Sequence, residues 1–138
     1  MTLDADVVRG RCEEIEQSLA RLRQIATMPR DTFLADADAR DIACYRLLVG
    51  IEAALALCYN VCARRLRSAP EDYAGCFATI EQAGLIDSRL SERLQRMARF
   101  RNLLVHVYWT IDYGRVHDVL QGDIEDLARF SHVVGGLL

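Results

Sequence analysis

The chain has 138 residues, of which 51% are hydrophobic and 27% charged, and its formal net charge is −3. This length is typical of one domain spanning residues 1–138, and the composition excludes disordered and collagen-like chains. Two prolines and eight glycines are few for a protein rich in turns. Their scarcity favours long helices.

The charges are unevenly distributed, and all seventeen basic residues are arginines. Residues 1–63 hold seven arginines and ten acids, residues 64–101 hold eight and five, and residues 102–138 hold two and five. An acidic chain with a pI near 5.6 is not typical of a non-specific nucleic-acid binder, and no DNA partner is expected. The distribution leaves room for a local basic site.

No stretch predicts a membrane span, because the longest charge-free run in the apolar region is residues 53–63, short of the ~18–20 apolar residues that a span needs. The first residues are acidic and are followed by Arg9 and Arg11, unlike a signal peptide. We therefore expect a cytoplasmic protein with no membrane partner.

The cysteines are odd in number and form no CxxC motif: Cys12, Cys44, Cys58, Cys62 and Cys76. This pattern predicts buried, reduced thiols. Cys58 and Cys62 are four residues apart with no histidine at ligand spacing, so we expect no zinc site.

Apolar residues in the first part of the chain repeat with helical spacing. Within residues 3–27 they step by four and three along one face: Val8, Cys12, Ile15, Leu19, Leu22 and Ala26. Pro29 then breaks the helix, because the residue before a proline disfavours helical geometry. Three acids open the next helix: Asp36, Asp38 and Asp41. They either complement the positive helix N-terminus, which we favour, or hold a divalent metal ion.

The remaining segments also predict helices. Residues 41–67 are apolar nearly all round, typical of a central helix that also serves a subunit interface. Residues 68–71, Ser-Ala-Pro-Glu, resemble a capping box and predict a helix from about residue 69 to Ala83, ended by Gly84. Asp87 or Ser88 caps the next helix, and residues 115–134 form the last apolar series, after a turn at 112–114. We predict an all-α bundle of up-down character.

The helix that begins near residue 87 carries an anomaly. One stripe contains Leu90, Leu94, Met97, Arg101, Leu104 and Tyr108, while Arg89, Arg93 and Arg96 form a separate, solvated face. Arg101 lies where the pattern expects an apolar residue. A guanidinium there is costly unless it is paired, for example with Glu52, or functional.

His106 follows Arg101 by five residues, a separation of ~140° on an ideal helix. The two side chains can cooperate only if the helix ends or bends there, or if two copies of the chain meet around the site. Residues 105–111 are rich in weak helix formers, which favours a bend. His117 and His132 are interpreted as core histidines.

Residues 100–113, FRNLLVHVYWTIDY, resemble the signature of the HepT-type toxins of the HEPN superfamily. The family pattern R-x4-H-x-Y is met by Arg101, His106 and Tyr108, with Asn102 directly after the arginine and Asp112 after the motif. The resemblance covers essentially the whole chain. It implies a homodimeric bundle of four or five helices whose two motifs line one cleft.

The same resemblance implies a metal-independent endoribonuclease with no cofactor, acting on tRNA or mRNA as the toxin of a toxin–antitoxin pair. Arg101, His106 and Asn102 would be catalytic. An MntA-like nucleotidyltransferase antitoxin would attach AMP to Tyr108. The residues suit this chemistry, because histidine exchanges protons near neutral pH and arginine presents a fork matched to phosphate.

Two other functions are compatible with parts of the pattern. In the first, the chain is a non-catalytic helical subunit that docks a nucleotidyltransferase, with Arg101 and His106 in the interface. In the second, the bundle binds a nucleotide or another small ligand, but no Gly-rich loop supports this.

Overall fold

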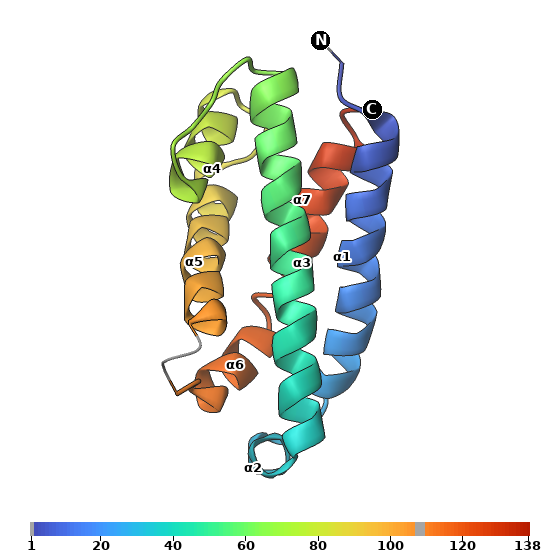
Figure 1. The fold of residues 1–138 in the computed structure, drawn as a ribbon, viewed down its shortest axis with the longest axis vertical. Coiled ribbons are helices and arrows are strands. Elements are labelled where there is room, and N and C mark those ends of the chain that lie inside the picture. Colours follow the sequence, from blue (N-terminus) through green and yellow to red (C-terminus); the bar gives the residue numbers. More distant parts are fainter. Residues whose placement is uncertain (1, 107–109) are drawn as a thin grey trace.

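The computed structural model describes residues 2–106 and 110–138, which form seven helices and, within these ranges, no strand (Figure 1). The helices are α1 Ala5–Ala26, α2 Arg30–Ala35, α3 Ala37–Arg64, α4 Tyr73–Gln82, α5 Ser88–Val105, α6 Tyr113–Leu120 and α7 Glu125–Gly135. The predicted all-α class is confirmed. The short helix α2, which follows the break at Pro29, was not predicted.

The long helices alternate in direction around α3 (Figure 1). Helices α1 and α7 lie on one side of α3, and α4 and α5 lie on the other, while α2 and α6 close one end. The start of α1 and the C-terminus lie together at the opposite end. This arrangement is the predicted up-down bundle, with α4 and α5 following one another along the same side.

Helix α3 is the centre of the core. Its buried residues face both flanking pairs of helices, and Leu47, Leu57, Cys58 and Val61 have no exposed surface. By length and composition α3 could also cross a membrane, but half of its most apolar window is buried inside this chain. The core helix of a bundle passes the same test of length and composition.

The start of α4 was predicted wrongly. Helix α3 ends at Arg64; beyond it Arg67 lies in the left-handed region (φ 52°), and the Ser68 amide donates to the Cys62 carbonyl at 2.8 Å. The Ser68 N–H therefore closes α3 instead of opening α4. Helix α4 begins at Tyr73, where the Asp72 side chain caps it by accepting from the Gly75 amide at 2.7 Å.

The last apolar series is interrupted, although the sequence pattern suggested one segment. Helix α6 ends at Leu120 and α7 begins at Glu125, separated by a polar turn that includes Gly122. Asp112 caps α6 by accepting from the Arg115 amide at 3.2 Å, so the predicted turn at 112–114 already contains the first residues of α6. The predicted stop at Gly135 and Gly136 is confirmed.

The prediction for the cysteines also needs correction. Cys58 of α3 and Cys76 of α4 form a disulfide, and Cys62 lies buried beside them. Sequence spacing linked only Cys58 and Cys62, because it did not show that α4 packs against α3. Cys12 and Cys44 are half-buried free thiols.

The two histidines outside the motif differ. His117 is buried, and its Nε2 lies 3.1 Å from the Met28 carbonyl oxygen, as expected of a core histidine. His132 is exposed on α7, so its assignment to the core was wrong.

Candidate functional site

The motif lies where α5 ends. Helix α5 stops at Val105, and His106 is its C-cap with an extended backbone (φ −82°, ψ 95°). The helix therefore ends between Arg101 and His106, which is one of the alternatives considered from the sequence, although the weak helix formers favoured a bend. Tyr108 lies outside the described residues, which resume at Thr110.

Arg101 is held by an ion pair from the central helix. Its Nε donates a hydrogen bond to Oε1 of Glu52 on α3, the partner considered from the sequence. The Arg101 side chain is 25% exposed and that of Glu52 is 42% exposed. The pair thus fixes the guanidinium in place while solvent still reaches it.

Asn102 and Tyr73 complete the surroundings of Arg101. Nη1 of Arg101 donates to Oδ1 of Asn102 at 3.3 Å. The Arg101 Cζ lies 5.9 Å from the ring centroid of Tyr73, the first residue of α4, within the range of a cation–π contact. The guanidinium therefore has contacts from α3, α4 and its own helix.

Tyr59 of α3 packs against Tyr73. Its ring meets that of Tyr73 edge-on, with centroids 5.3 Å apart. Burial raises the pKa of the Tyr59 hydroxyl, and the nearby Tyr73 and Asp72 add to the effect. The Tyr59 hydroxyl is thus poorly suited to give up a proton at neutral pH, and its ring packs against Tyr73, which contacts the Arg101 guanidinium.

Sequence analysis missed Tyr73 and Tyr59. Their place beside Arg101 depends on how α4 and α5 pack on α3, and no local pattern predicts that packing. A pairing of Arg101 with Glu52 is the one sequence feature that places this part of α3 next to the motif.

Asn102 and His106 lie four residues apart, and both side chains are exposed. The structure thus brings Arg101, Asn102, Glu52 and Tyr73 together, with His106 about one turn further along at the helix end. Arg101 uses Nε and Nη1 in the contacts above, and a guanidinium has five N–H donors. The others can bind an anion such as a phosphate oxygen.

The arginines of the separate α5 face do not all behave as predicted. Arg89 and Arg96 are exposed, as expected of a solvated face. Arg93 is instead half-buried, and its Nε donates to Oδ2 of Asp126 at 2.8 Å, a carboxylate that is 3% exposed. The pattern missed this pair because it did not place α7 beside α5.

The acids at the start of α3 act as helix-terminal residues. Asp36 is the N-cap and accepts a hydrogen bond from the Ala39 amide at 3.0 Å, and Asp38 lies in the first turn. This placement agrees with the favoured interpretation of these acids.

Two solved structures and a characterised relative resemble the chain. An mRNA nuclease HepT from Shewanella oneidensis is 24% identical over 129 residues, covering 94% of this chain and 96% of the relative. A tri-AMPylated Shewanella oneidensis HEPN toxin, solved in complex with an MNT antitoxin, superposes with a TM-score of 0.85 at 24% identity, covering 95% and 98%. A protein from Thermus thermophilus superposes with a TM-score of 0.63 at 21% identity, covering 88% and 96%.

A family model covers most of the chain. It describes the HepT-like ribonucleases and matches residues 15–134, which include α3, where Glu52 lies, and the motif at the end of α5. The sequence signature, the all-helical bundle and this match agree. The chain belongs to the HepT-like ribonuclease family.

Proposed function

We propose that this protein is a toxin endoribonuclease that cleaves RNA, either mRNA or tRNA, at a site built from Arg101, Asn102 and His106 and without a metal ion. The observation that carries the proposal is the position of Arg101. Glu52 and Tyr73 hold its guanidinium at the surface, at the helix end that His106 caps. The similarity to the mRNA nuclease HepT supports the same activity.

The chemistry follows from the three side chains. RNA cleavage through the 2′-hydroxyl requires a base for that hydroxyl, stabilisation of charge on the phosphorane oxygens, and an acid for the leaving 5′-oxygen. His106 exchanges the protons. Arg101 binds the phosphate oxygens on which charge develops. Asn102, which already contacts Arg101, orients a phosphate oxygen or the imidazole.

Two copies of the chain supply two histidines, so that one acts as base and the other as acid. A half-exposed stripe along α3 supports such a homodimer: Tyr45, Val49, Glu52 and Ala56 follow one face of the helix, and Tyr45 is 61% exposed. Glu52 belongs to this stripe and to the Arg101 pair. A twofold contact along the stripe therefore places both sites next to the interface.

The partner is an MntA-like nucleotidyltransferase antitoxin in the cytoplasm. In this proposal it transfers AMP to Tyr108, two residues beyond His106. If Tyr108 lies beside Arg101, the added phosphate and nucleoside bring negative charge and bulk to the place where the substrate phosphate binds. The AMPylated toxin found in complex with an MNT antitoxin supports such a modification.

A cleavage assay tests the function. Purified wild type, Arg101→Ala and His106→Ala are incubated with RNA in EDTA, with His132→Ala as the control for an exposed histidine outside the site. Wild type and His132→Ala should cleave, and both site variants should lose at least about 100-fold in rate. Loss of wild-type cleavage in EDTA, or full activity of His106→Ala, would contradict the proposal.

A growth assay separates the nuclease from the interaction subunit. Expression without the antitoxin should stop growth, and Arg101→Ala should restore it while its circular dichroism spectrum stays helical. If the folded Arg101→Ala protein were as toxic as wild type, Arg101 would not be part of a nuclease site.

A further inference from the structure

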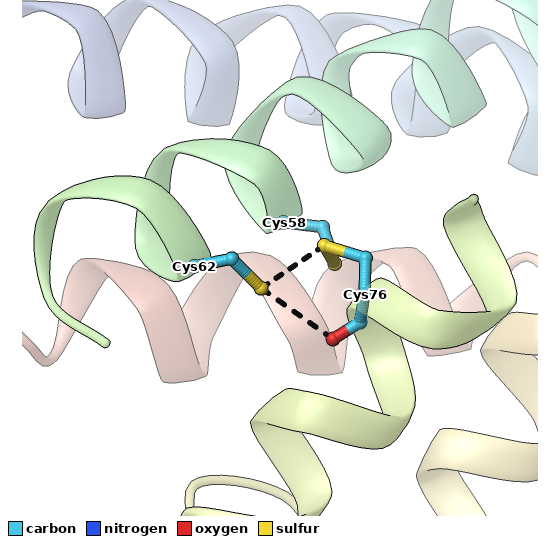
Figure 2. Close-up of side chains that lie close together, drawn as sticks. All are labelled: Cys58, Cys62 and Cys76. Carbon is cyan, nitrogen blue, oxygen red and sulfur yellow. Dashed lines mark hydrogen bonds between the residues drawn. A yellow bond between two sulfur atoms is a disulfide. The ribbon is translucent and has the colours of Figure 1, made fainter. Parts of the chain in front are cut away.

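Three cysteine side chains meet in the core between α3 and α4 (Figure 2). Cys58 and Cys62 lie one turn apart on α3, Cys76 comes from α4, and none of the three has exposed surface. Their sulfur atoms all lie within 4.8 Å of one another. Cys58 and Cys76 form the disulfide, and Sγ of Cys62 lies 3.2 Å from Sγ of Cys76.

We propose that these residues form a thiol–disulfide exchange site, in which Cys76 pairs with either Cys58 or Cys62. The thiolate of Cys62 attacks Sγ of Cys76, so that the Cys62–Cys76 bond forms while the Cys58–Cys76 bond breaks. Cys58 leaves as a thiolate and takes up the proton that Cys62 lost. The number of electrons does not change, so the exchange needs no external oxidant.

The geometry shows one pairing and places the third sulfur in contact with it. The Cα atoms of Cys58 and Cys76 are 6.3 Å apart, within the range of disulfides. Cys62 presents its sulfur from the next turn of the same helix face, in contact with the sulfur that it would attack. Formation of the first disulfide from three thiols requires a two-electron oxidant, for which a small-molecule disulfide such as glutathione disulfide is sufficient.

Burial slows the thiol–disulfide exchange. Burial raises the pKa of the Cys62 thiol, which lowers its thiolate fraction and slows the exchange. Burial also shields the disulfide from thiols in solution. Exchange between the two pairings can therefore proceed inside the protein, whereas oxidation or reduction by glutathione requires a local opening of the α3–α4 contact.

The choice of disulfide partner for Cys76 determines where α4 is attached to α3. Either disulfide ties α4 to α3, and exchange moves the attachment point one helical turn, about 6 Å, along α3. Tyr73, which lies beside Arg101, is three residues before Cys76 on the same helix. The site thus links a redox-sensitive bond to Tyr73 in the motif site, although the thiol chemistry itself does not depend on the proposed ribonuclease function.

Thiol mapping on the wild-type protein tests the proposal. The full chain is equilibrated in glutathione buffers of increasing oxidation, quenched with acid, denatured and alkylated, and the peptides are identified by mass spectrometry. We expect one intramolecular disulfide per chain, with the remaining thiol of the trio divided between Cys58 and Cys62. A thiol found only at Cys62, or three thiols in the most oxidising buffer, would overturn the proposal.

Alanine variants provide the second test. Cys58→Ala should form the Cys62–Cys76 disulfide and Cys62→Ala the Cys58–Cys76 disulfide, within about tenfold of each other in the glutathione equilibrium. Cys44→Ala is the control, because Cys44 is a free thiol outside the trio. If Cys58→Ala stays helical but forms no disulfide, Cys62 is not an exchange partner.

Three converging thiolates would also suit a soft metal ion such as Cu(I) or Zn(II). Elemental analysis of the purified protein distinguishes a metal site from a thiol–disulfide exchange site. One tightly bound metal equivalent together with three reduced thiols would overturn the exchange site, whereas metal-free protein with a disulfide supports it.

Discussion

Glu52 and Arg101 are 49 residues apart in the sequence, yet the carboxylate of one accepts a hydrogen bond from Nε of the other across the α3–α5 contact. Both side chains are partly exposed, and exposed ion pairs contribute at most about 1 kcal/mol to stability. The main effect of the pair is therefore geometric. It fixes the fork of Arg101 next to Asn102 and against Tyr73.

We predict that Glu52→Gln keeps the fold but impairs the proposed RNA cleavage. The amide still fits the space but carries no charge, so Arg101 is oriented less firmly, and kcat should fall by about 10- to 100-fold. The free energy of unfolding should change by no more than about 1 kcal/mol. Cleavage rates and urea denaturation measure the two quantities.

The control for Glu52→Gln is Glu13→Gln, because Glu13 is exposed on α1, away from the motif. It should leave both quantities unchanged. An active Glu52→Gln protein would show that Arg101 does not need the carboxylate to hold its position.

A conservative change at Tyr108 should separate cleavage from its inhibition. Tyr108→Phe removes the hydroxyl to which AMP would be attached while keeping the ring. The variant should cleave RNA at a rate within a few-fold of wild type, and a nucleotidyltransferase antitoxin with ATP should no longer add AMP to it. Intact-mass spectrometry measures the modification, and Tyr113→Phe serves as the control. An unchanged mass increase on Tyr108→Phe would place the modification elsewhere.

Sequence periodicity predicted those features that depend on one helix alone. The apolar stripe of α1, the apolar character of α3 and the Asp87 cap, which accepts from the Leu90 amide at 2.7 Å, are all present. The end of α5 before His106 was one of the alternatives considered, because weak helix formers and the separation of Arg101 from His106 are local signals.

Features that depend on contacts between different helices could not be predicted from sequence periodicity. The disulfide partner Cys76, the Arg93–Asp126 pair and Tyr73 all require knowledge of a neighbouring helix. The prediction of a helix end was also wrong where the same residues could either start one helix or close the previous one. At Ser68 the apparent capping box predicted a start, but the backbone uses that amide to close α3.

Loss of Arg93 should destabilise the fold more than loss of another arginine on α5. The Asp126 carboxylate is 3% exposed and is held by Arg93 and by Arg129, each at 2.8 Å. Arg93→Ala leaves this carboxylate with one partner fewer in a buried position, which should lower the free energy of unfolding by about 2 kcal/mol. Arg89→Ala, at an exposed position of the same helix, should cost less than about 0.5 kcal/mol. If urea denaturation showed that Arg93→Ala and Arg89→Ala lower the free energy of unfolding equally, the buried carboxylate would not need Arg93.

Two glycines should respond to alanine with opposite signs. Gly84 ends α4 with φ +78°, a conformation that a Cβ disfavours, so Gly84→Ala should destabilise the protein by about 1 kcal/mol. Gly10 lies inside α1, and a Cβ there would meet no atom within 4 Å. Gly10→Ala should therefore stabilise by about 0.5–1 kcal/mol. Thermal unfolding measures the stability of both variants. A Gly84→Ala protein more stable than wild type would show that the left-handed conformation at Gly84 does not require glycine.

The pair between Arg23 of α1 and Glu125 of α7 should make stability depend on pH in the acid range. Two hydrogen bonds of 2.9 Å join the guanidinium to the carboxylate, and they lower the pKa of Glu125 below its ordinary value of 4.5. A lowered folded-state pKa means that the stabilisation is fully present above the unfolded pKa and is lost as the pH falls through the folded one.

Glu125→Gln tests this dependence against wild type. Because both side chains are more than a third exposed, solvent screening limits the difference in the free energy of unfolding to about 1 kcal/mol at pH 7. The difference should shrink as the pH falls below about 4.5, where the carboxylate of the unfolded chain becomes protonated, and it should be lost as the pH passes the lowered pKa of the folded state. Urea denaturation from pH 7 to pH 3 measures it, with Glu13→Gln as the exposed control on α1. A difference that stays constant over this range would show that the Glu125 charge does not contribute, since only the ionised carboxylate pairs with Arg23.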